Sequence, residues 1–380
     1  MKQIMMVDLQ TQYATIQGEI DDAVHKVMRD CDFINGAKVQ EFGESLAAFT
    51  GSKHAVCCAN GTDALQIALM ALDLNKGDEL IMPAFCYAAA VEVTAFLGLK
   101  AVLVDVDPAT YNIDARKIEA AISNKTRAII PVHLFGQSCD MLPINNICKK
   151  NNLIIIEDNA QSLGAVYSFP DGEKKQTGTM GNIGTLSFFP TKNLACYGDG
   201  GAMLCNDDKV AAKLKMIASH GQSKKYQHDI IGCNSRLDTL QAAILSVKLP
   251  YLNQYAARRQ AAAAYYKKGL EGLENEILMP LEAPFSTHVF HQFTMQILHS
   301  RREQLKAFLQ KEGIPSMVYY PIPLHKQKAY ENLVCASGSL KHSDMLCKTV
   351  LSLPMHSELE NKQMDFIIEK IHAFFGSKII

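Results

Sequence analysis

Residues 54–72 read HAVCCANGTDALQIALMAL, and this stretch decides the fold. The β-rich run at 54–58 predicts a short strand, and Asn-Gly-Thr-Asp at 60–63 predicts a turn. Apolar residues at helical spacing then predict a helix over 62–72. A strand that leads through a tight turn into a helix is the repeating unit of α/β folds, whose strands are mostly parallel.

The same alternation of strand and helix continues to residue 158. We predict strands at 78–83, 101–106, 127–133 and 153–158, and helices at 88–99, 115–122 and 143–151. Two further strands are predicted at 184–189 and 200–205, on either side of a loop that contains glycines. The pattern predicts an α/β fold with a large, mostly parallel mixed sheet and helices on its faces.

The chain after residue 207 is mostly helical in pattern. Residues 237–273 predict one long helix, broken near Pro250, that leads out of the sheet. A strand at 288–298, a helix at 302–313 and a strand at 317–323 then predict a smaller α+β unit. We therefore expect a large domain over 1–250, whose first thirty residues form a helix, and a small domain over 251–380.

The composition excludes several classes of partner. Lys and Arg total 38 against 39 for Asp and Glu, so no net field recruits nucleic acid or an anionic membrane. No apolar run is long enough to span a bilayer, and the N-terminus does not resemble a signal peptide. The eleven cysteines lack zinc-ligand spacing, which favours free thiols in a reducing compartment and no metal site. We expect a cytoplasmic protein.

Two motifs follow predicted strands at the edge where open α/β sheets bind ligands. The turn at 60–63 offers free backbone N–H groups at a helix N-terminus, which suits a phosphate, although Thr62 and Asp63 are also ordinary helix-capping residues. Asp158, after the apolar run 153–156, could hold a pyridine-type nitrogen protonated. Taken alone, Asp158 is better explained as a cap for the next helix.

Lys192 lies in the most informative stretch, SFFPTKNLACYGDGG at 187–201. A lysine directly after a predicted buried strand is not a solvated surface charge, and an amine there could bind a carbonyl cofactor covalently. A plain helix-flanking charge is the alternative. The glycines at 198–201 do not follow the GxGxxG order of a nicotinamide-dinucleotide site.

Five ordered segments of the chain resemble the DegT/DnrJ/EryC1/StrS sugar aminotransferases. They are NGTDAL, EDNAQS, SFFPTKNLACYGDGGA, HGQSKKYQHDIIGCNSRLDTLQAAIL and YPIPLHKQ, within a similarity that runs from FINGAKVQEF to SLPMH. The resemblance implies a fold-type-I enzyme that depends on pyridoxal 5′-phosphate.

The resemblance also implies roles for single residues. Lys192 matches the lysine that forms the Schiff base with the cofactor, and Asp158 matches the partner of its ring nitrogen. The other implied cofactor contacts are the backbone of Gly61 and Thr62, the ring of Tyr87, the side chains of Gln161 and Ser187, and Asn234 reaching across from the partner of a homodimer. The implied substrate contacts are Arg236, Tyr319, Tyr320 and His325. Tyr319 departs from the family, because a histidine is expected at that position.

The implied reaction moves an amino group from L-glutamate to a ketone of a nucleotide-linked sugar. Asn-Ser-Arg-Leu-Asp at 234–238 resembles the branch that aminates C3, for example on UDP-2-acetamido-2-deoxy-3-oxo-glucuronate in surface polysaccharide synthesis. Lysine at position 192 disfavours sugar dehydration, since relatives that dehydrate carry histidine there. A dTDP-linked 3-oxo-6-deoxyhexose as substrate, and a regulator of the same fold without turnover, remain alternatives.

Overall fold

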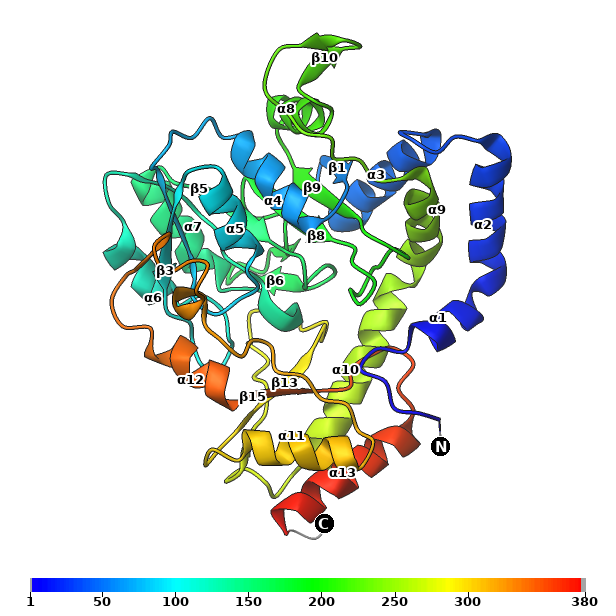
Figure 1. The fold of residues 1–380 in the computed structure, drawn as a ribbon, viewed down its shortest axis with the longest axis vertical. Coiled ribbons are helices and arrows are strands. Elements are labelled where there is room, and N and C mark those ends of the chain that lie inside the picture. The colour runs from blue at the N-terminus through cyan, green and yellow to red at the C-terminus, as the bar shows by residue number, and fades with distance from the viewer. Residues whose placement is uncertain (1, 377–380) are drawn as a thin grey trace.

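An eight-stranded sheet forms the centre of the protein. The computed structural model describes residues 2–376, and the strand order is β1-β9-β8-β5-β4-β2-β3-β14 (Figure 1). The strands in this order are His54–Cys58, Gly201–Cys205, Ile183–Ser187, Ile154–Asp158, Thr126–Ile129, Glu79–Pro83, Lys100–Val104 and Val334–Ala336. From β8 to β14 all pairs are parallel, whereas β9 pairs antiparallel with both β8 and β1. The predicted mostly parallel mixed sheet is confirmed.

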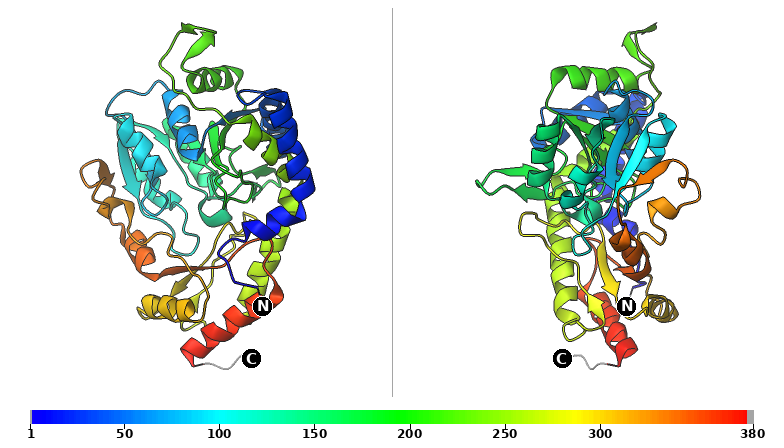
Figure 2. Two further views of the ribbon diagram at one scale, coloured as in Figure 1. Left: turned by 45° about the vertical axis from the view of Figure 1, so that its right-hand side comes forward. Right: turned by 90° about the vertical axis from the view of Figure 1, so that its left-hand side faces the viewer.

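Helices cover both faces of this sheet, as Figure 2 shows from two further sides. The helices within this part of the chain are α3 (Ala37–Thr50), α4 (Gly61–Met70), α5 (Ala89–Phe96), α6 (Ala115–Ile118), α7 (Met141–Asn151) and α8 (Asp208–Ala218). Along β2, Leu80 and Met82 join one hydrophobic cluster while Ile81 joins another on the opposite face. Because neighbouring strand residues point to opposite faces, nearly continuous apolar strands are needed for a sheet covered on both sides.

The long helical segment breaks as predicted. It forms α9 (Thr239–Lys248), a short 3₁₀ turn at Leu249–Tyr251 that contains Pro250, and α10 (Leu252–Gly269). The predicted N-terminal helix is divided into α1 (Leu9–Thr15) and α2 (Gln17–Asp30). Ile16 and Ile20 pack on Ile244 of α9, so the start of the chain docks on the large sheet unit.

A second hydrophobic core lies in the C-terminal part. The antiparallel sheet β12-β13-β15 (Ile277–Leu278, Phe293–Ile297, Val350–Leu353) packs with α10, α11 (Arg302–Lys311) and α13 (Asn361–Phe375). After α11 the chain returns to the large sheet to add β14 before α12 (Lys341–Thr349). We propose that 251–380 acts as a small domain that lends β14 to the large sheet.

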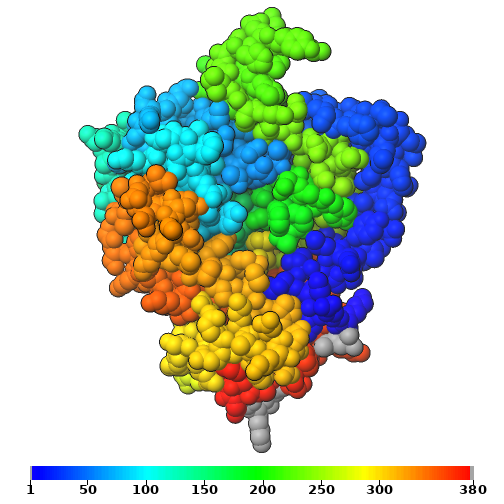
Figure 3. Space-filling view, in the orientation of Figure 1, coloured from blue at the N-terminus to red at the C-terminus, as the bar shows by residue number. Residues whose placement is uncertain are grey.

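Two local features differ from the sequence predictions. Residues 317–323 do not form a strand, because Pro321 and Pro323 lack the backbone donors that a ladder needs, and only Met317 pairs with Ser352. Residues 222–228 form a hairpin, β10–β11 (Gln222–Lys224 and Gln227–His228), that the helical interpretation missed. This hairpin projects from the molecule at the end away from α11 and α13 (Figures 1 and 3). A smaller hairpin, β6–β7, covers Val166–Ser168 and Lys174–Gln176.

Within residues 2–376 the eleven cysteines are all free thiols. Across the same residues, every helix is too short or too polar to cross a membrane.

Candidate active site

A cavity of about 550 Å³ opens between the large sheet and the C-terminal part of the chain. Most of the residues predicted to bind a cofactor or substrate line it. They are Gly61, Thr62, Tyr87, Asp158, Gln161, Ser187, Lys192, Tyr319 and Tyr320. Asp158 ends β5 and Ser187 ends β8, two neighbouring parallel strands, so the cavity lies at the carboxyl edge of the sheet.

The turn between β1 and α4 forms one end of the cavity. The Asn60 side chain accepts a hydrogen bond from Asp63 N at 2.8 Å and caps α4, which leaves the N–H groups of Gly61 and Thr62 at the helix start. A Cβ on Gly61 would lie 2.7 Å from the Ser187 Cβ, and one on Gly201 would lie 2.4 Å from the Asn60 carbonyl oxygen. Glycine is therefore required at both positions for β8 and β9 to approach the turn, and the resulting cradle suits a phosphate.

Asp158 lies on the floor of the cavity with 7% of its surface exposed. Burial raises the pKa of its carboxyl, while the N–H of Ala160, Lys192 and His133 act in the opposite direction. Its neighbour Glu157 points the other way, because a strand alternates faces, and pairs with His133 Nε2 at 2.8 Å in the interior. Of the two neighbouring carboxylates, Glu157 and Asp158, it is therefore Asp158 that can contact a ligand in the cavity.

Lys192 lines the same cavity as Asp158. Burial lowers the pKa of its amine from 10.5 to about 8, and the attraction of Asp158 only partly opposes that shift. At pH 7.5 roughly a quarter of such amines would be uncharged, against about one in a thousand for an ordinary lysine. Lys192 is therefore available both as a nucleophile and as a base.

The loop that carries Lys192 is held from α9. Lys248 donates to the Ala195 carbonyl at 2.8 Å, and the Gln241 side chain accepts from Tyr197 N at 2.9 Å. Cys196 N donates to the Phe188 carbonyl at 2.8 Å and closes the loop onto the end of β8.

The Gln161 amide has a defined orientation. Its oxygen accepts from Phe135 N at 2.8 Å and its nitrogen donates to the Tyr320 hydroxyl at 3.1 Å. The Tyr320 ring in turn lies 6.1 Å from the ring of Tyr87, which is 59% exposed at the mouth of the cavity. The two aromatic rings and the amide form a continuous part of the cavity wall.

Three predicted residues lie outside this cavity. Asn234 is exposed, and Arg236 lines a separate hollow beside Lys53 and Lys215. Asn234 was expected to act across a dimer, so its place outside the cavity of its own chain leaves that prediction open. Arg236 was predicted to contact the substrate, and it does not line this cavity. His325 pairs with Asp344 at 3.0 Å and does not line the cavity.

Sequence reasoning missed His291 and Gln292, which line the cavity from the C-terminal part. The run HVFHQFTMQIL was interpreted as one strand, whereas β13 begins only at Phe293. The polar pair at the start of an otherwise apolar run was the available signal. Asn60 and Asp199 also line the cavity, inside motifs that had been recognised for other residues.

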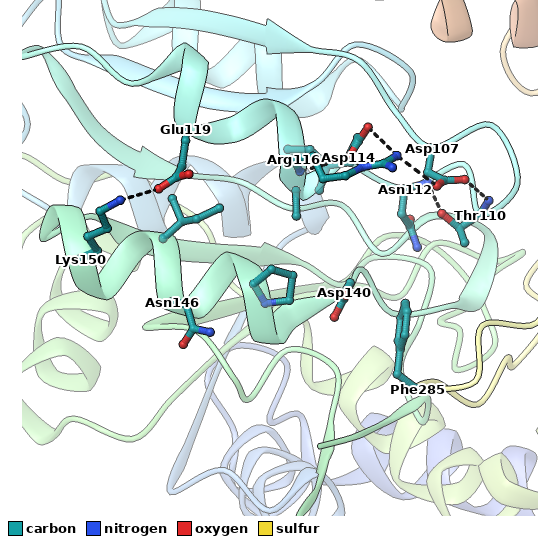
Figure 4. Close-up of a pocket in the computed structure, with 14 residues that line it drawn as sticks. Asp107, Thr110, Asn112, Asp114, Arg116, Glu119, Asp140, Asn146, Lys150 and Phe285 are labelled. Carbon is teal, nitrogen blue, oxygen red and sulfur yellow. Dashed lines mark hydrogen bonds and ion pairs between the residues drawn. The ribbon is translucent and has the colours of Figure 1, made fainter. Parts of the chain in front are cut away.

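A second hollow, of about 580 Å³, lies between α6 and α7 (Figure 4). Both of its basic side chains are held in ion pairs, Arg116 with Asp114 at 2.8 Å and Lys150 with Glu119 at 2.9 Å. The hollow therefore offers no amine comparable to Lys192, and we place the active site in the other cavity.

Comparison with known proteins agrees with this geometry. Residues 14–372 match the DegT/DnrJ/EryC1/StrS aminotransferase family. The chain belongs to this family. Among solved structures, a DegT/DnrJ/EryC1/StrS aminotransferase from Brucella abortus superposes with a TM-score of 0.93 at 38% identity, covering 98% of this chain and 100% of that one. NtdA from Bacillus subtilis, solved with bound PMP, superposes with a TM-score of 0.86 at 31% identity over 95% of this chain and 82% of its own.

Three relatives extend the comparison across the DegT/DnrJ/EryC1/StrS family. A pleiotropic regulatory protein of Geobacillus stearothermophilus is 44% identical over 98% of both chains. The UDP-2-acetamido-2-deoxy-3-oxo-D-glucuronate aminotransferase of Pseudomonas aeruginosa is 43% identical over 96% of this chain and 98% of its own. A UDP-N-acetyl-3-dehydro-α-D-glucosamine 3-aminotransferase of Acidithiobacillus ferrooxidans is 41% identical over 95% of each.

As a DegT/DnrJ/EryC1/StrS aminotransferase, the chain depends on pyridoxal phosphate, and the residues of the cavity fit that group. A phosphate needs the N–H donors and hydroxyl that the Gly61 turn and Ser187 present. A pyridinium nitrogen needs a buried carboxylate, and the aldehyde needs an amine that is partly uncharged at neutral pH. Asp158 and Lys192 have these properties.

Proposed function

We propose that the chain transfers the amino group of L-glutamate to the C3 ketone of UDP-2-acetamido-2-deoxy-3-oxo-glucuronate, in the synthesis of a surface polysaccharide. The observation that carries the amino transfer is Lys192, whose pKa is lowered to about 8, in the same cavity as Asp158. The choice of sugar is supported by two relatives above 40% identity, both named for amination of a UDP-linked 3-oxo sugar.

Several residues of the cavity have a task in this proposal. The Gly61 turn and Ser187 hold the phosphate, and Tyr87 covers the ring. Asp158 keeps the ring nitrogen protonated, and the cofactor then supplies an electron sink for the carbon that loses a proton. With the cofactor bound, the Lys192 amine would take the α-proton of the amino donor, and in the reverse direction it would deliver a proton to the sugar carbon that receives the amino group.

We further propose a homodimer in which Asn234 reaches the cofactor phosphate of the partner and Arg236 contacts the substrate there. Asn234 is exposed in a single chain. Nearby, Tyr226 is 82% and Ile231 is 85% exposed on and beside the projecting hairpin. Exposed apolar side chains on a protrusion favour burial against another protein surface.

The experiment offers three ketones to the protein with its cofactor and L-glutamate, each made in situ from its precursor. They are the UDP-linked 3-oxo-glucuronate, the UDP-linked 3-oxo-glucosamine and a dTDP-linked 3-oxo-6-deoxyhexose. Mass spectrometry detects the amine. We expect the glucuronate amine at the highest rate, and preference for either other sugar would contradict the assignment of the substrate.

A regulatory role is the second candidate, because the relative at 44% identity is named a pleiotropic regulatory protein. The complete set of Lys192, Asp158 and Gln161 in one cavity favours turnover. A protein that binds the cofactor but aminates none of the three sugars would favour the regulator instead.

A further inference from the structure

His291 is a buried histidine beside the reactive lysine that has no role in the account above. It lines the same cavity as Lys192 and Asp158 with only 4% of its surface exposed. Burial lowers the pKa of its ring well below 6.5, and the nearby charges of Lys192 and Arg259 lower it further. The imidazole is therefore neutral at physiological pH, with one donor and one acceptor nitrogen.

The two ring nitrogens of His291 have different surroundings. Nδ1 is enclosed and has no hydrogen-bond partner within residues 2–376. By contrast, both nitrogens of the buried His133 are used, Nδ1 by Cys139 N and Nε2 by Glu157. A buried donor without a partner is rarer in proteins than an acceptor without one, so the proton of His291 belongs on Nε2. The Nε2–H group can then donate a hydrogen bond to a ligand in the cavity.

The loop 288–292 is fixed by an unusual number of side-chain donors. Gln260 donates to the His288 carbonyl at 3.0 Å and Asn193 to the Val289 carbonyl at 3.1 Å. Arg259, 2% exposed, donates to the carbonyls of Phe290 at 3.1 Å and His291 at 3.4 Å.

Strain accompanies this fixation. Phe290 has a φ of 44°, a left-handed conformation that is energetically unfavourable for a residue with a large side chain. A Cβ on Gly136 would lie 2.8 Å from the backbone nitrogens of both Phe290 and His291, so the loop packs directly on that glycine. The buried charge of Arg259 and the strained backbone of Phe290 both destabilise the fold. In return, the contacts that they make hold His291 and Gln292 in a fixed position beside Lys192.

We propose that His291 Nε2 donates a hydrogen bond to an oxygen of the bound nucleotide-linked sugar and so fixes that sugar for amination. The inference rests on the proposed function, because it needs a sugar in the cavity. A neutral donor suits a hydroxyl or amide oxygen, and it adds no charge next to Lys192. Gln292 lines the same cavity and adds a second neutral polar group next to His291.

Isosteric variants test the assignment of Nε2. The Gln amide places a donor close to the position of Nε2, whereas the Asn amide reaches only the position of Nδ1. We expect His291→Asn and His291→Phe to raise the dissociation constant of the aminated UDP-sugar roughly tenfold by calorimetry, the loss of one hydrogen bond. His291→Gln should recover most of the affinity. The rate at which L-glutamate converts the bound cofactor should stay within about twofold in all three, since this half-reaction involves no sugar.

His356→Phe is the matched control, because His356 is 3% exposed, has a pKa that burial lowers, as His291 does, and lies outside the cavity. It should bind the sugar as the wild type does. Equal affinity in His291→Phe and the wild type would overturn the assignment, and so would an equal slowing of the glutamate reaction. A wild type that binds and aminates no nucleotide sugar would overturn the proposed function as well.

Discussion

Two lysines, the partly buried Lys192 and the buried Lys248, show how the surroundings of a residue decide its task. Burial lowers the pKa of each from 10.5 to about 8. Lys192 reaches a cavity and a carboxylate, whereas Lys248 donates to the Ala195 carbonyl and lies 4.9 Å from the centre of the Tyr197 ring. The two amines thus have the same lowered pKa, but Lys192 is placed for chemistry whereas Lys248 positions a loop.

Lys248 gives a prediction about stability and pH. Its pKa is lower in the folded chain than in the unfolded chain, so between pH 8 and 10.5 the unfolded chain binds more protons. The stability contributed by Lys248 should therefore rise with pH across this window, by up to about 3 kcal/mol. Urea unfolding of the wild type and Lys248→Met at pH 7.5 and 10.5 measures it. A difference between the two proteins that is the same at both pH values would contradict the buried amine.

Asp158 gives a prediction about rate. Asp158→Asn removes the charge that keeps the ring nitrogen protonated, so the glutamate half-reaction should slow by roughly 100-fold or more while the cofactor stays bound. Stopped-flow absorbance measures this rate. Asp114→Asn, which alters a buried aspartate outside the cavity, should leave it unchanged. An Asp158→Asn rate close to that of the wild type would show that another group performs this task.

At the residue scale, sequence motifs predicted the site residues that directly follow strands, although these residues lie far apart along the chain. Gly61, Asp158 and Lys192 each follow a strand of the parallel sheet, so their meeting at one edge follows from the fold class. His291 could not be placed, because its position depends on how Arg259 and Gly136 pack against a loop from another part of the chain.

At the element scale, the β1–α4 turn depends on contact with the start of β9. Gly201→Ala would force a methyl group against the Asn60 carbonyl and displace the phosphate cradle. We expect at least tenfold weaker cofactor binding, measured by fluorescence titration. Gly18→Ala is the control, because nothing lies within 4 Å of a Cβ there and the position is inside helix α2. It should stabilise the protein slightly and leave cofactor affinity unchanged.

Helices and strands with a clear pattern of apolar residues were predicted well, and irregular elements were not. The apolar strands β2 to β5 and the break at Pro250 follow from local pattern and from proline geometry. The run 317–323 resembled a strand in composition, yet its prolines prevent a ladder. The hairpin at 222–228 is largely exposed and packs little of its surface on the core. Its strands therefore lack the apolar residues by which a strand is recognised in a sequence.

At the scale of the whole molecule, a shared active site predicts complementation between two inactive variants. Lys192→Ala lacks the reactive amine, and Asn234→Ala lacks the residue proposed to reach the partner's phosphate. In a mixed dimer one of the two sites regains both residues, so random mixing should restore about a quarter of the wild-type activity. Activity assays after unfolding and joint refolding measure it. No recovery, or a monomer by light scattering, would contradict the shared site.

The most direct test of the account is the absorbance of the purified protein with pyridoxal phosphate. We predict a visible band that L-glutamate removes, that the UDP-linked 3-oxo-glucuronate restores, and that is missing in Lys192→Ala. The band reports the covalent link to the Lys192 amine, and its cycle reports both halves of amino transfer. An identical band in Lys192→Ala, or a wild-type band that glutamate leaves unchanged, would contradict the central claim.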